Sequence, residues 1–300
     1  MAEPAIHTSG LSKRYADVDA LSDLDLDVHQ GEVVGYLGPN GSGKTTTLRL
    51  LLGLIRPTSG SAEIFGLDCQ RRPVEAHRRL AYVAGEANLW PSLTGSETLH
   101  LLGRVQGQVD AAYRGELIAR FDLDPSKKVR TYSKGNRQKL ILIAALMARP
   151  DLLLLDEPAS SLDPLARRAL LTELVEAVAA DGTTVLLSSH LIADVERVCD
   201  HLVILSRGRV QLAGDIDTLR EEHQMIVGPR MDPAAAAADP TVVSAHHADR
   251  ESALLVRCPG KVPPDGWRTE PLSLEDLVLA YLENPAAGTP APAVAVGVGS

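Results

Sequence analysis

The sequence predicts an α/β fold: a mostly parallel sheet covered by helices, with an antiparallel addition near the N-terminus. Short segments that are almost wholly apolar are typical of strands buried on both faces of such a sheet. Three segments have this character: 33–37, 152–155 and 185–187. Segments with helical hydrophobic spacing lie between and around them: 44–55, 133–147 and 165–180. This alternation of elements favours the α/β class.

A different pattern precedes the first apolar strand. From Asp23 to Val28 the chain alternates strictly, so that Leu24, Leu26 and Val28 face one way and three aspartates face the other. A strand with one wet face is typical of an antiparallel sheet. We therefore expect residues 22–28 to form an antiparallel strand beside the main sheet.

The chain changes character near residue 220, and this change sets the predicted domains. We assign residues 1–220 to one large domain, 221–283 to a small accessory domain and 284–300 to a disordered tail. The tail consists mostly of Ala, Pro, Gly and Val. Within the accessory domain we expect a linker or sheet edge at 225–239, short strands at 241–244 and 253–256, and a helix after Ser273, a suitable N-cap.

The amino-acid composition argues against some classes of function. Hydrophobic residues make up 45% of the 300 residues, aromatic residues make up 3%, and the net charge is −9. An acidic chain with few aromatic side chains and no long basic run does not favour nucleic-acid binding. No apolar run reaches the ~20 residues that cross a bilayer, and we expect no signal peptide. The scattered cysteines, Cys69, Cys199 and Cys258, indicate neither a disulfide framework nor a zinc site, which fits a reducing cytoplasm.

A glycine-rich loop after the first apolar strand matches the pattern GxxxxGK[ST] of phosphate-binding loops. Its residues are Gly38, Pro39, Asn40, Gly41, Ser42, Gly43, Lys44 and Thr45, and Thr46 follows them. Glycines let backbone N–H groups turn toward phosphates, and the N-terminus of the next helix adds favourable partial charge. We expect Lys44 to neutralise the β- and γ-phosphates of a nucleotide and the Thr45 hydroxyl to hold Mg²⁺. The alternative, an ordinary glycine-rich turn, does not explain the strand–loop–helix setting.

Two acids follow the apolar segment at 152–155. Asp156 and Glu157 stand at the end of a predicted buried strand, and ligands of open parallel sheets sit at strand ends. We expect Asp156 to bind Mg²⁺ through water and Glu157 to polarise the attacking water. Taken alone, such a pair is usually a solvated loop. Together with the phosphate loop it indicates nucleotide hydrolysis.

These motifs and one further loop resemble those of the ABC ATPase family over residues 5–215. The loop is Tyr132-Ser133-Lys134-Gly135-Asn136-Arg137-Gln138. It is similar to the family's signature Leu-Ser-Gly-Gly-Gln, and its Tyr-Ser-Lys-Gly form resembles the subgroup that serves multidrug, antibiotic and lipid exporters. The resemblance implies a P-loop NTPase fold with an antiparallel β subdomain, a helical subdomain and a small C-terminal α+β extension. It also implies a head-to-tail dimer in which Ser133 and Gly135 contact ATP held by the other copy; in isolation, Ser133 would be a plain helix cap.

Further positions match the family pattern. Tyr15 resembles the aromatic residue that stacks on adenine, and the alternative is a core tyrosine. His190 resembles the switch histidine that contacts the γ-phosphate, so the resemblance implies a catalytic set of Glu157, His190 and Lys44. The tripeptide at 161–163, Ser-Leu-Asp, resembles the loop that lines the dimer interface.

The chain departs from the family where a glutamine normally follows the strand at 81–84. Gly85 occupies that position, and Glu86 is next to it. Glu86 either substitutes as a Mg²⁺ ligand, since a carboxylate is also a hard oxygen donor, or is an ordinary solvated loop acid.

The resemblance implies an ATPase, using ATP and Mg²⁺, that powers an exporter for a drug, an antibiotic or a lipid. It would act at the cytoplasmic face of the membrane with a separate polytopic permease and a second copy of itself, the permease touching the surface near residues 85–100. The alternatives are a soluble ABC ATPase acting in translation, repair or cluster assembly, and a small-molecule kinase, which would not explain the signature loop or His190. Import in place of export stays open, and so does the role of 221–283, in dimer contact or in regulation.

Overall fold

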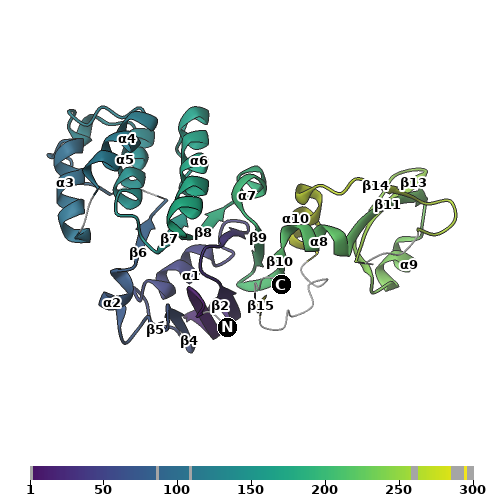
Figure 1. The fold of residues 1–300 in the computed structure, drawn as a ribbon. Helices are drawn as coiled ribbons and strands as arrows, with labels where there is room; N and C mark the ends of the chain where they lie inside the picture. Colours follow the sequence, from purple (N-terminus) through teal and green to yellow (C-terminus); the bar gives the residue numbers. More distant parts are fainter. Residues whose placement is uncertain (1–2, 86–87, 108–109, 258–262, 285–293, 296–300) are drawn as a thin grey trace.

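We describe the protein from a computed structural model, in which residues 3–85, 88–107, 110–257, 263–284 and 294–295 are described. Figure 1 shows three parts side by side. A body with two sheets lies at the centre, a layer of helices lies above it at one end, and a smaller sheet extends at the other end. This arrangement confirms the predicted α/β class with its antiparallel and helical additions and its C-terminal extension.

Six strands form the central sheet: β3 (Val33–Leu37), β6 (Leu80–Val83), β7 (Leu152–Asp156), β8 (Thr184–Ser189), β9 (His201–Ser206) and β10 (Arg209–Asp215). Their order is β10-β9-β3-β8-β7-β6, and all neighbours are parallel except β10, which runs antiparallel to β9. The three predicted apolar strands are confirmed as β3, β7 and β8, whose residues are all buried. Strands β9 and β10 have no counterpart among the predicted elements.

The apolar character of these strands follows from two separate cores, one on each face of the central sheet. Leu153 and Leu155 of β7 belong to the core on the helical side, whereas Leu152 and Leu154 belong to the core shared with the second sheet. Because side chains alternate along a strand, both sets must be apolar when both faces are covered. The continuous leucine run is the sequence signature of that arrangement.

The second sheet contains five strands: β1 (Ile6–Tyr15), β2 (Val18–Val28), β4 (Ser59–Ile64), β5 (Leu67–Asp68) and β15 (Val294–Ala295). Strand β2 is antiparallel to β1, and Leu24, Leu26 and Val28 are buried, so the predicted alternating strand is confirmed. Strand β15 lies within the predicted disordered tail, yet its two residues pair in parallel with Leu26 and Asp27 of β2. The expectation of no structure there was wrong for these two residues, because β2 would otherwise leave its outer backbone groups as a sheet edge. The other tail residues beyond Asn284 lie outside the described ranges.

Helix α1 (Lys44–Leu51) packs between the two sheets, against β2, β4 and β7. It ends four residues before the predicted limit of 55. Gly53 has a φ of 64°, and a Cβ built there would lie 2.3 Å from the carbonyl oxygen of Cys69. The chain therefore turns away from the helix at a position where only glycine fits.

The helices of the body and of the helical layer are α2 (Pro73–His77), α3 (Gly95–Gln106), α4 (Ala111–Arg120), α5 (Lys134–Leu146), α6 (Pro164–Asp181) and α7 (Ile192–Val198). Helices α5 and α6 confirm the two predicted helices within two residues at each end. Each starts at a side chain that accepts a backbone hydrogen bond: Ser133 caps α5 and Asp163 caps α6. These caps satisfy N–H groups that have no partner inside the helix.

The C-terminal part contains α8 (Ile216–Glu222), β11 (His223–Pro229), α9 (Pro233–Ala238), β12 (Val242–His247), β13 (Glu251–Arg257), β14 (Arg268–Glu270) and α10 (Leu274–Glu283). Strands β12 and β13 and the helix after Ser273 confirm three predictions, and Ser273 forms a capping box with Asp276. The prediction of a linker or sheet edge at 225–239 was wrong for 225–229, because β11 pairs with both β13 and β14 and so lies inside the sheet. Gly228 marks the place where the ring of Trp267 approaches the backbone of β11 too closely for any side chain.

Helix α10 joins the C-terminal part to the body. It packs against α7, α8, β9, β10 and β12, and Leu277, Val278 and Tyr281 belong to the same core as the central sheet. The predicted boundary at 220/221 falls within α8.

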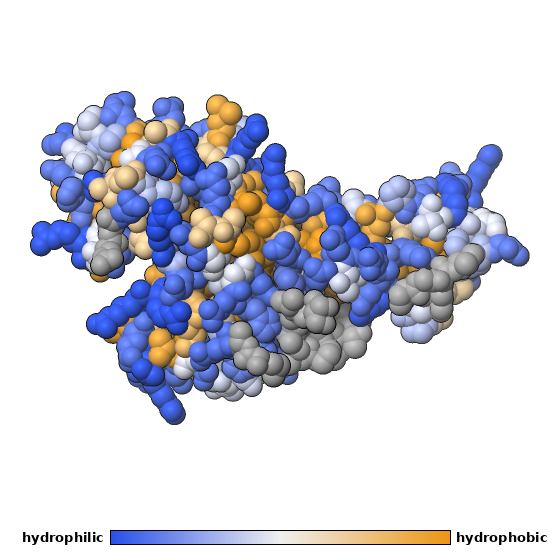
Figure 2. All heavy atoms as spheres, viewed as in Figure 1, coloured by the Kyte–Doolittle hydropathy of each residue, from blue (hydrophilic) through white to orange (hydrophobic). Residues whose placement is uncertain are grey.

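Figure 2 shows apolar side chains gathered at the middle of the molecule, around the place of α7 and α10 in Figure 1. In the described ranges, no helix combines the length and the apolar character needed to span a bilayer.

Candidate active site

The phosphate loop connects the end of β3 to α1, where glycines let the backbone pack tightly. A Cβ built on Gly38 would lie 2.2 Å from the carbonyl oxygen of Leu205 in β9. One built on Gly43, whose φ is 114°, would lie 2.6 Å from the carbonyl oxygen of Ala20. These contacts fix the loop against its surroundings, so its curved backbone does not depend on a bound ligand.

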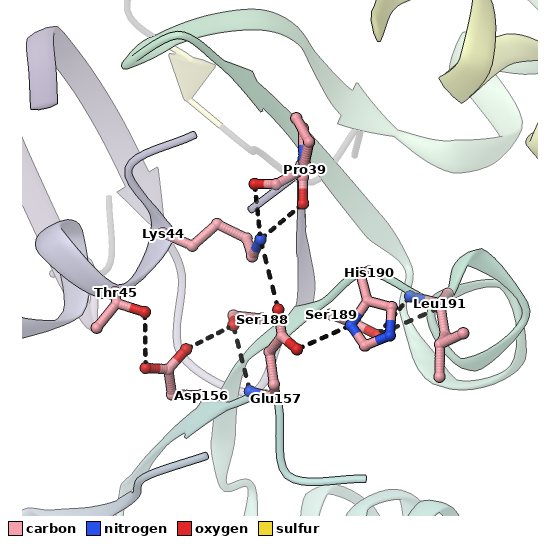
Figure 3. Close-up of polar contacts among 10 residues, drawn as sticks. Pro39, Lys44, Thr45, Asp156, Glu157, Ser188, Ser189, His190 and Leu191 are labelled. Carbon is pink, nitrogen blue, oxygen red and sulfur yellow. Dashed lines mark hydrogen bonds and ion pairs between the residues drawn. The ribbon is translucent and has the colours of Figure 1, made fainter. Parts of the chain in front are cut away.

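Lys44 is buried, and its ammonium group has partners on two sides (Figure 3). Nζ donates hydrogen bonds to the carbonyl oxygens of Gly38 at 2.6 Å and Pro39 at 3.2 Å. It also lies 3.5 Å from Oε1 of Glu157. A buried cation requires such compensation. The geometry places the charge of Lys44 between the phosphate loop and the acid that follows β7.

Asp156 receives hydroxyl hydrogen bonds on both carboxylate oxygens (Figure 3). Thr45 Oγ1 donates to Oδ2 at 2.9 Å, and Ser188 Oγ donates to Oδ1 at 3.0 Å. Thr45 and Asp156 are the two residues that the sequence predicts as Mg²⁺ ligands, and the fold brings them together across 111 positions. A hydroxyl and a carboxylate are hard oxygen donors of the kind that Mg²⁺ prefers, so this donor set fits the ion.

The phosphate loop also holds an unused hydrogen-bonding group. Ser42 is buried, and its Oγ has no hydrogen-bond partner among the described residues. A buried hydroxyl without a partner is unfavourable, and a phosphate oxygen would accept its hydrogen bond. This orphaned atom is therefore an observation that fits a nucleotide phosphate at the loop.

Glu157 has a strained backbone and a side chain held at both oxygens. Its φ is 49°, which is uncommon for a residue with a side chain. Oε2 lies 2.8 Å from Nδ1 of His190, and Oε1 faces Lys44 (Figure 3). Residues held in this way cluster at functional sites, where neighbouring contacts maintain the strain. The arrangement turns the carboxylate of Glu157 toward the phosphate loop, away from the direction of Asp156.

A cleft of about 820 Å³ lies at this site, lined by the phosphate loop from Asn40 to Thr46 and by both acids, whereas Gly38, Pro39 and His190 do not line it. The predicted residues on its wall include Tyr15, Asn40, Lys44, Asp156 and Glu157. Tyr15 is 43% exposed at the end of β1, which excludes the alternative of a core tyrosine. The ring has Lys13 Nζ 4.9 Å from its centroid. Its exposed face is available to an aromatic base.

The cleft also contains residues that the sequence did not single out: Arg49, Tyr82, Asn88 and Ser160. Tyr82 and Asn88 flank Gly85 and Glu86, the segment that departs from the family. Their closeness to that segment in the sequence could have identified them as cleft residues. Burial and the charge of Asp156 raise the pKa of Tyr82 to about 12, so its hydroxyl stays protonated at neutral pH.

The signature loop has a different relation to the cleft. Ser133 accepts a hydrogen bond from the backbone N–H of Asn136 at 3.1 Å and caps α5. Ser133 and Gly135 are not among the residues that line the described cleft, although Lys134 is. A Cβ built on Gly135 would lie 2.9 Å from the carbonyl oxygen of Ser161, so the signature loop packs against the 161–163 loop.

The segment of the missing glutamine lies directly beside the acid pair. A Cβ built on Gly85 would lie 3.0 Å from the carbonyl oxygen of Asp156. Glu86, the predicted additional Mg²⁺ ligand, lies outside the described residues, so its role stays a prediction. Gln138 of α5 donates to the carbonyl oxygen of Ala84 at 3.2 Å and ties this segment to the helical layer.

Comparisons with known proteins agree with this geometry. Residues 21–160 match the family described as "ABC transporter". The chain is 40% identical to the daunorubicin/doxorubicin resistance ATP-binding protein DrrA of Streptomyces peucetius over 221 residues, which cover 72% of this chain and 67% of that protein. It is also 40% identical to the Nod factor export ATP-binding protein I of Cupriavidus pinatubonensis, over 66% of this chain and 62% of that protein. A solved ATP-binding subunit of an ABC transporter superposes with a TM-score of 0.66 and 34% identity, covering 72% of this chain and 92% of its own.

Proposed function

This chain belongs to the family of ABC transporter ATP-binding subunits, and we propose that it powers export of a drug, antibiotic or lipid through a separate membrane permease. The family hydrolyses ATP. Export is supported by the names of two relatives, one a daunorubicin/doxorubicin resistance protein and the other a Nod factor export protein. The observation that carries the proposal is the position of Glu157, between Lys44 and His190 at the phosphate loop.

In the proposed mechanism, the cleft holds ATP by contacts of three kinds. Tyr15 stacks on adenine, the backbone N–H groups from Gly38 to Thr46 receive the phosphates, and Lys44 exchanges its loop carbonyls for phosphate oxygens. Thr45 and Asp156 would hold Mg²⁺. When bound, Mg²⁺ neutralises charge on the β- and γ-phosphates.

Glu157 acts on the water that attacks the γ-phosphorus. It accepts the water's proton while the bond from the γ-phosphorus to the β–γ bridging oxygen breaks, giving ADP and phosphate. His190 donates from Nδ1 to Oε2 of Glu157, and a hydrogen bond from Nε2 of its exposed ring to the γ-phosphate requires the imidazolium form, in which both ring nitrogens carry a proton. The hydrogen bond between His190 and Glu157 already exists, so the carboxylate of Glu157 needs little reorganisation at the moment of reaction.

A second copy of the chain completes each site. Ser133 and Gly135 do not line the cleft of their own copy, which supports their contact with ATP held by a partner copy. The N-terminus of α5, which Ser133 caps, carries favourable partial charge for a γ-phosphate. ATP would then join the two copies, and its hydrolysis would release them.

The permease contacts the exposed apolar surface of the helical layer. Trp90 is 49% exposed, and Leu101 and Val105 of α3 are 38% and 78% exposed. Exposed apolar side chains on one element favour a protein contact. Trp90 follows two residues after Asn88, which lines the cleft, so a shift of this segment at the nucleotide would reach the proposed permease contact. With this contact, the proposed site of action is the cytoplasmic face of the membrane.

The substitution Glu157→Gln tests the catalytic assignment. We expect steady-state ATP hydrolysis to fall by roughly 10²–10⁴-fold with ATP affinity unchanged, because the amide fills the same space but accepts no proton at neutral pH. Glu221→Gln, on the exposed side of α8, is the matched control. Rapid turnover in Glu157→Gln would exclude Glu157 as the main base.

Transport is tested by purifying the tagged chain from detergent-solubilised membranes of its host. We expect a polytopic membrane protein in stoichiometric amount, identified by mass spectrometry. A ribosome or a DNA-repair complex in its place would contradict export and favour the soluble alternative. The ATPase assignment does not depend on that result.

A further inference from the structure

Ser188 lies beneath the two acids of the cleft and has no role in the mechanism above. It is the penultimate residue of β8 and is fully buried. Neighbouring strands of the central sheet place it beside the end of β7, where Ser188 is paired with Asp156. No sequence pattern selects it, because a serine in an apolar strand has no motif of its own.

Ser188 contacts both acids at once (Figure 3). Its hydroxyl donates to Oδ1 of Asp156 at 3.0 Å. The backbone N–H of Glu157 donates to the carbonyl oxygen of Ser188 at 3.1 Å and lies 3.3 Å from its hydroxyl oxygen. A single buried residue therefore connects Asp156, the proposed metal ligand, to Glu157, the proposed base.

The contact with Asp156 fixes the orientation of its carboxylate. A carboxylate on a short side chain rotates about its last bond unless both oxygens are held. Ser188 on β8 donates to Oδ1, and Thr45 in the phosphate loop donates to Oδ2. Residues that orient a metal ligand in this way raise metal affinity, and their removal typically lowers it by roughly 10–100-fold.

The contact with Glu157 supports its strained backbone. A φ of 49° is costly for a glutamate and persists only where the surroundings enforce it. The Glu157 N–H is directed at both oxygens of Ser188, which holds the peptide in the orientation that turns the side chain toward Lys44. Loss of the hydroxyl removes one of these two acceptors.

We propose that Ser188 is a positioning residue that sets the Mg²⁺-binding orientation of Asp156 and the direction of Glu157. The proposal rests on the proposed ATPase function of this cleft. The rival explanation is a purely structural serine, whose loss would destabilise the sheet without a specific effect on Mg²⁺. Thr184 allows the two to be separated. It is an equally buried hydroxyl on the same strand, it accepts from the N–H of Gly31 at 3.0 Å, and it does not line the cleft.

The test compares Ser188→Ala, Ser188→Thr and Thr184→Val by equilibrium binding of a fluorescent ATP analogue, titrated with and without Mg²⁺. We expect Ser188→Ala to raise the Mg²⁺ concentration for half-maximal enhancement of binding by about tenfold, with Mg²⁺-free binding unchanged. Ser188→Thr keeps the hydroxyl and should restore the affinity for Mg²⁺. Thr184→Val should lower the melting temperature and leave the Mg²⁺ titration as in the wild type.

Hydrolysis provides the second readout. Ser188→Ala should lower kcat by about tenfold at saturating Mg²⁺ with little change in KM, since the direction of Glu157 is also affected. If Ser188→Ala does not fold, Ser188→Cys serves in its place, because a thiol has a similar volume but is a weak donor.

Two results would overturn the proposal: a wild-type Mg²⁺ titration in Ser188→Ala, or an equal shift in Thr184→Val. The binding arm does not require turnover. A wild-type chain that binds Mg²⁺ and ATP but does not hydrolyse ATP would therefore contradict the proposed function while leaving the Ser188 assignment to be judged by binding.

Discussion

The buried pair of His223 and Tyr281 gives the sharpest test of how the C-terminal part is attached. Nδ1 of His223 lies 2.7 Å from the carbonyl oxygen of Leu219, which can only accept, so Nδ1 carries the proton. Nε2 must then accept, and Tyr281 Oη donates to it at 2.8 Å. This hydrogen bond joins β11 to α10, and both side chains are at most 2% exposed.

Tyr281→Phe should destabilise this junction by about 2 kcal/mol. The phenylalanine ring keeps the edge-on contact with His223, at 5.6 Å between centroids and an interplanar angle of 77°. What is lost is the donor to Nε2, and a buried acceptor without a partner costs about 1–3 kcal/mol. A change of about 2 kcal/mol corresponds to roughly 30-fold faster exchange of the backbone amides that open locally.

Hydrogen exchange followed by mass spectrometry measures this effect in peptides from 274–283 and 223–229. Tyr113→Phe is the control, because Tyr113 is only half-buried and its hydroxyl lies 3.4 Å from Glu173; we expect a change below about 1 kcal/mol. In the double variant His223→Leu/Tyr281→Phe, the loss should be smaller than the sum of the single losses by about 1 kcal/mol or more. Unchanged exchange in α10 of Tyr281→Phe would refute the reasoning.

Three further predictions concern pH, packing and the missing glutamine. Burial lowers the pKa of His223, so its contribution to stability is full above about pH 6.5 and is lost as pH falls toward the lower folded value, as urea titrations from pH 7.5 to 5 would show. Gly228→Ala should destabilise the small sheet by about 1–3 kcal/mol, because the new Cβ would lie 2.3 Å from Cδ2 of Trp267. Gly85→Gln should lower kcat several-fold, because its Cβ would press on the Asp156 carbonyl at 3.0 Å, as steady-state kinetics would detect.

The first two of these predictions have control variants, and each of the three has an outcome that would contradict it. The His223→Leu variant should not show the additional loss of unfolding free energy between pH 6.5 and 5. If it shows the same loss as the wild type, another group causes the pH dependence. Gly115→Ala, in α4 with nothing within 4 Å of the new Cβ, should stabilise by up to about 1 kcal/mol. Equal stability of the Gly228 and Gly115 variants would contradict the packing argument. Faster turnover in Gly85→Gln would show that the glycine is a defect which the glutamine repairs.

Much of the active site was predictable because its parts are local. The phosphate loop needs glycines, a lysine and a threonine within eight positions, and the acid pair directly follows an apolar strand. Helix caps are local as well, so Ser133 and Ser273 were identified from the sequence and are confirmed as N-caps. In each case the residues that make the contact are separated by only a few positions in the chain.

Other features could not be read from any segment alone. Strand β11 has a glycine and a proline near its end and resembles a linker, yet pairing with β13 and β14 supplies hydrogen bonds that offset this local preference. Tyr82 and Ser188 enter the site only because β6 and β8 flank β7 in the sheet. No spacing rule in one dimension specifies which strands become neighbours.

The sequence by itself therefore determined the class of fold, the loop that receives phosphate and the identity of the two acids. Tertiary structure decided that Thr45 meets Asp156, that Glu157 lies between Lys44 and His190, and that α10 completes the core of the body. The physical reason is the range of the interactions. Capping and turn preferences act over a few residues, whereas these contacts depend on burial that only the assembled sheets and helices provide.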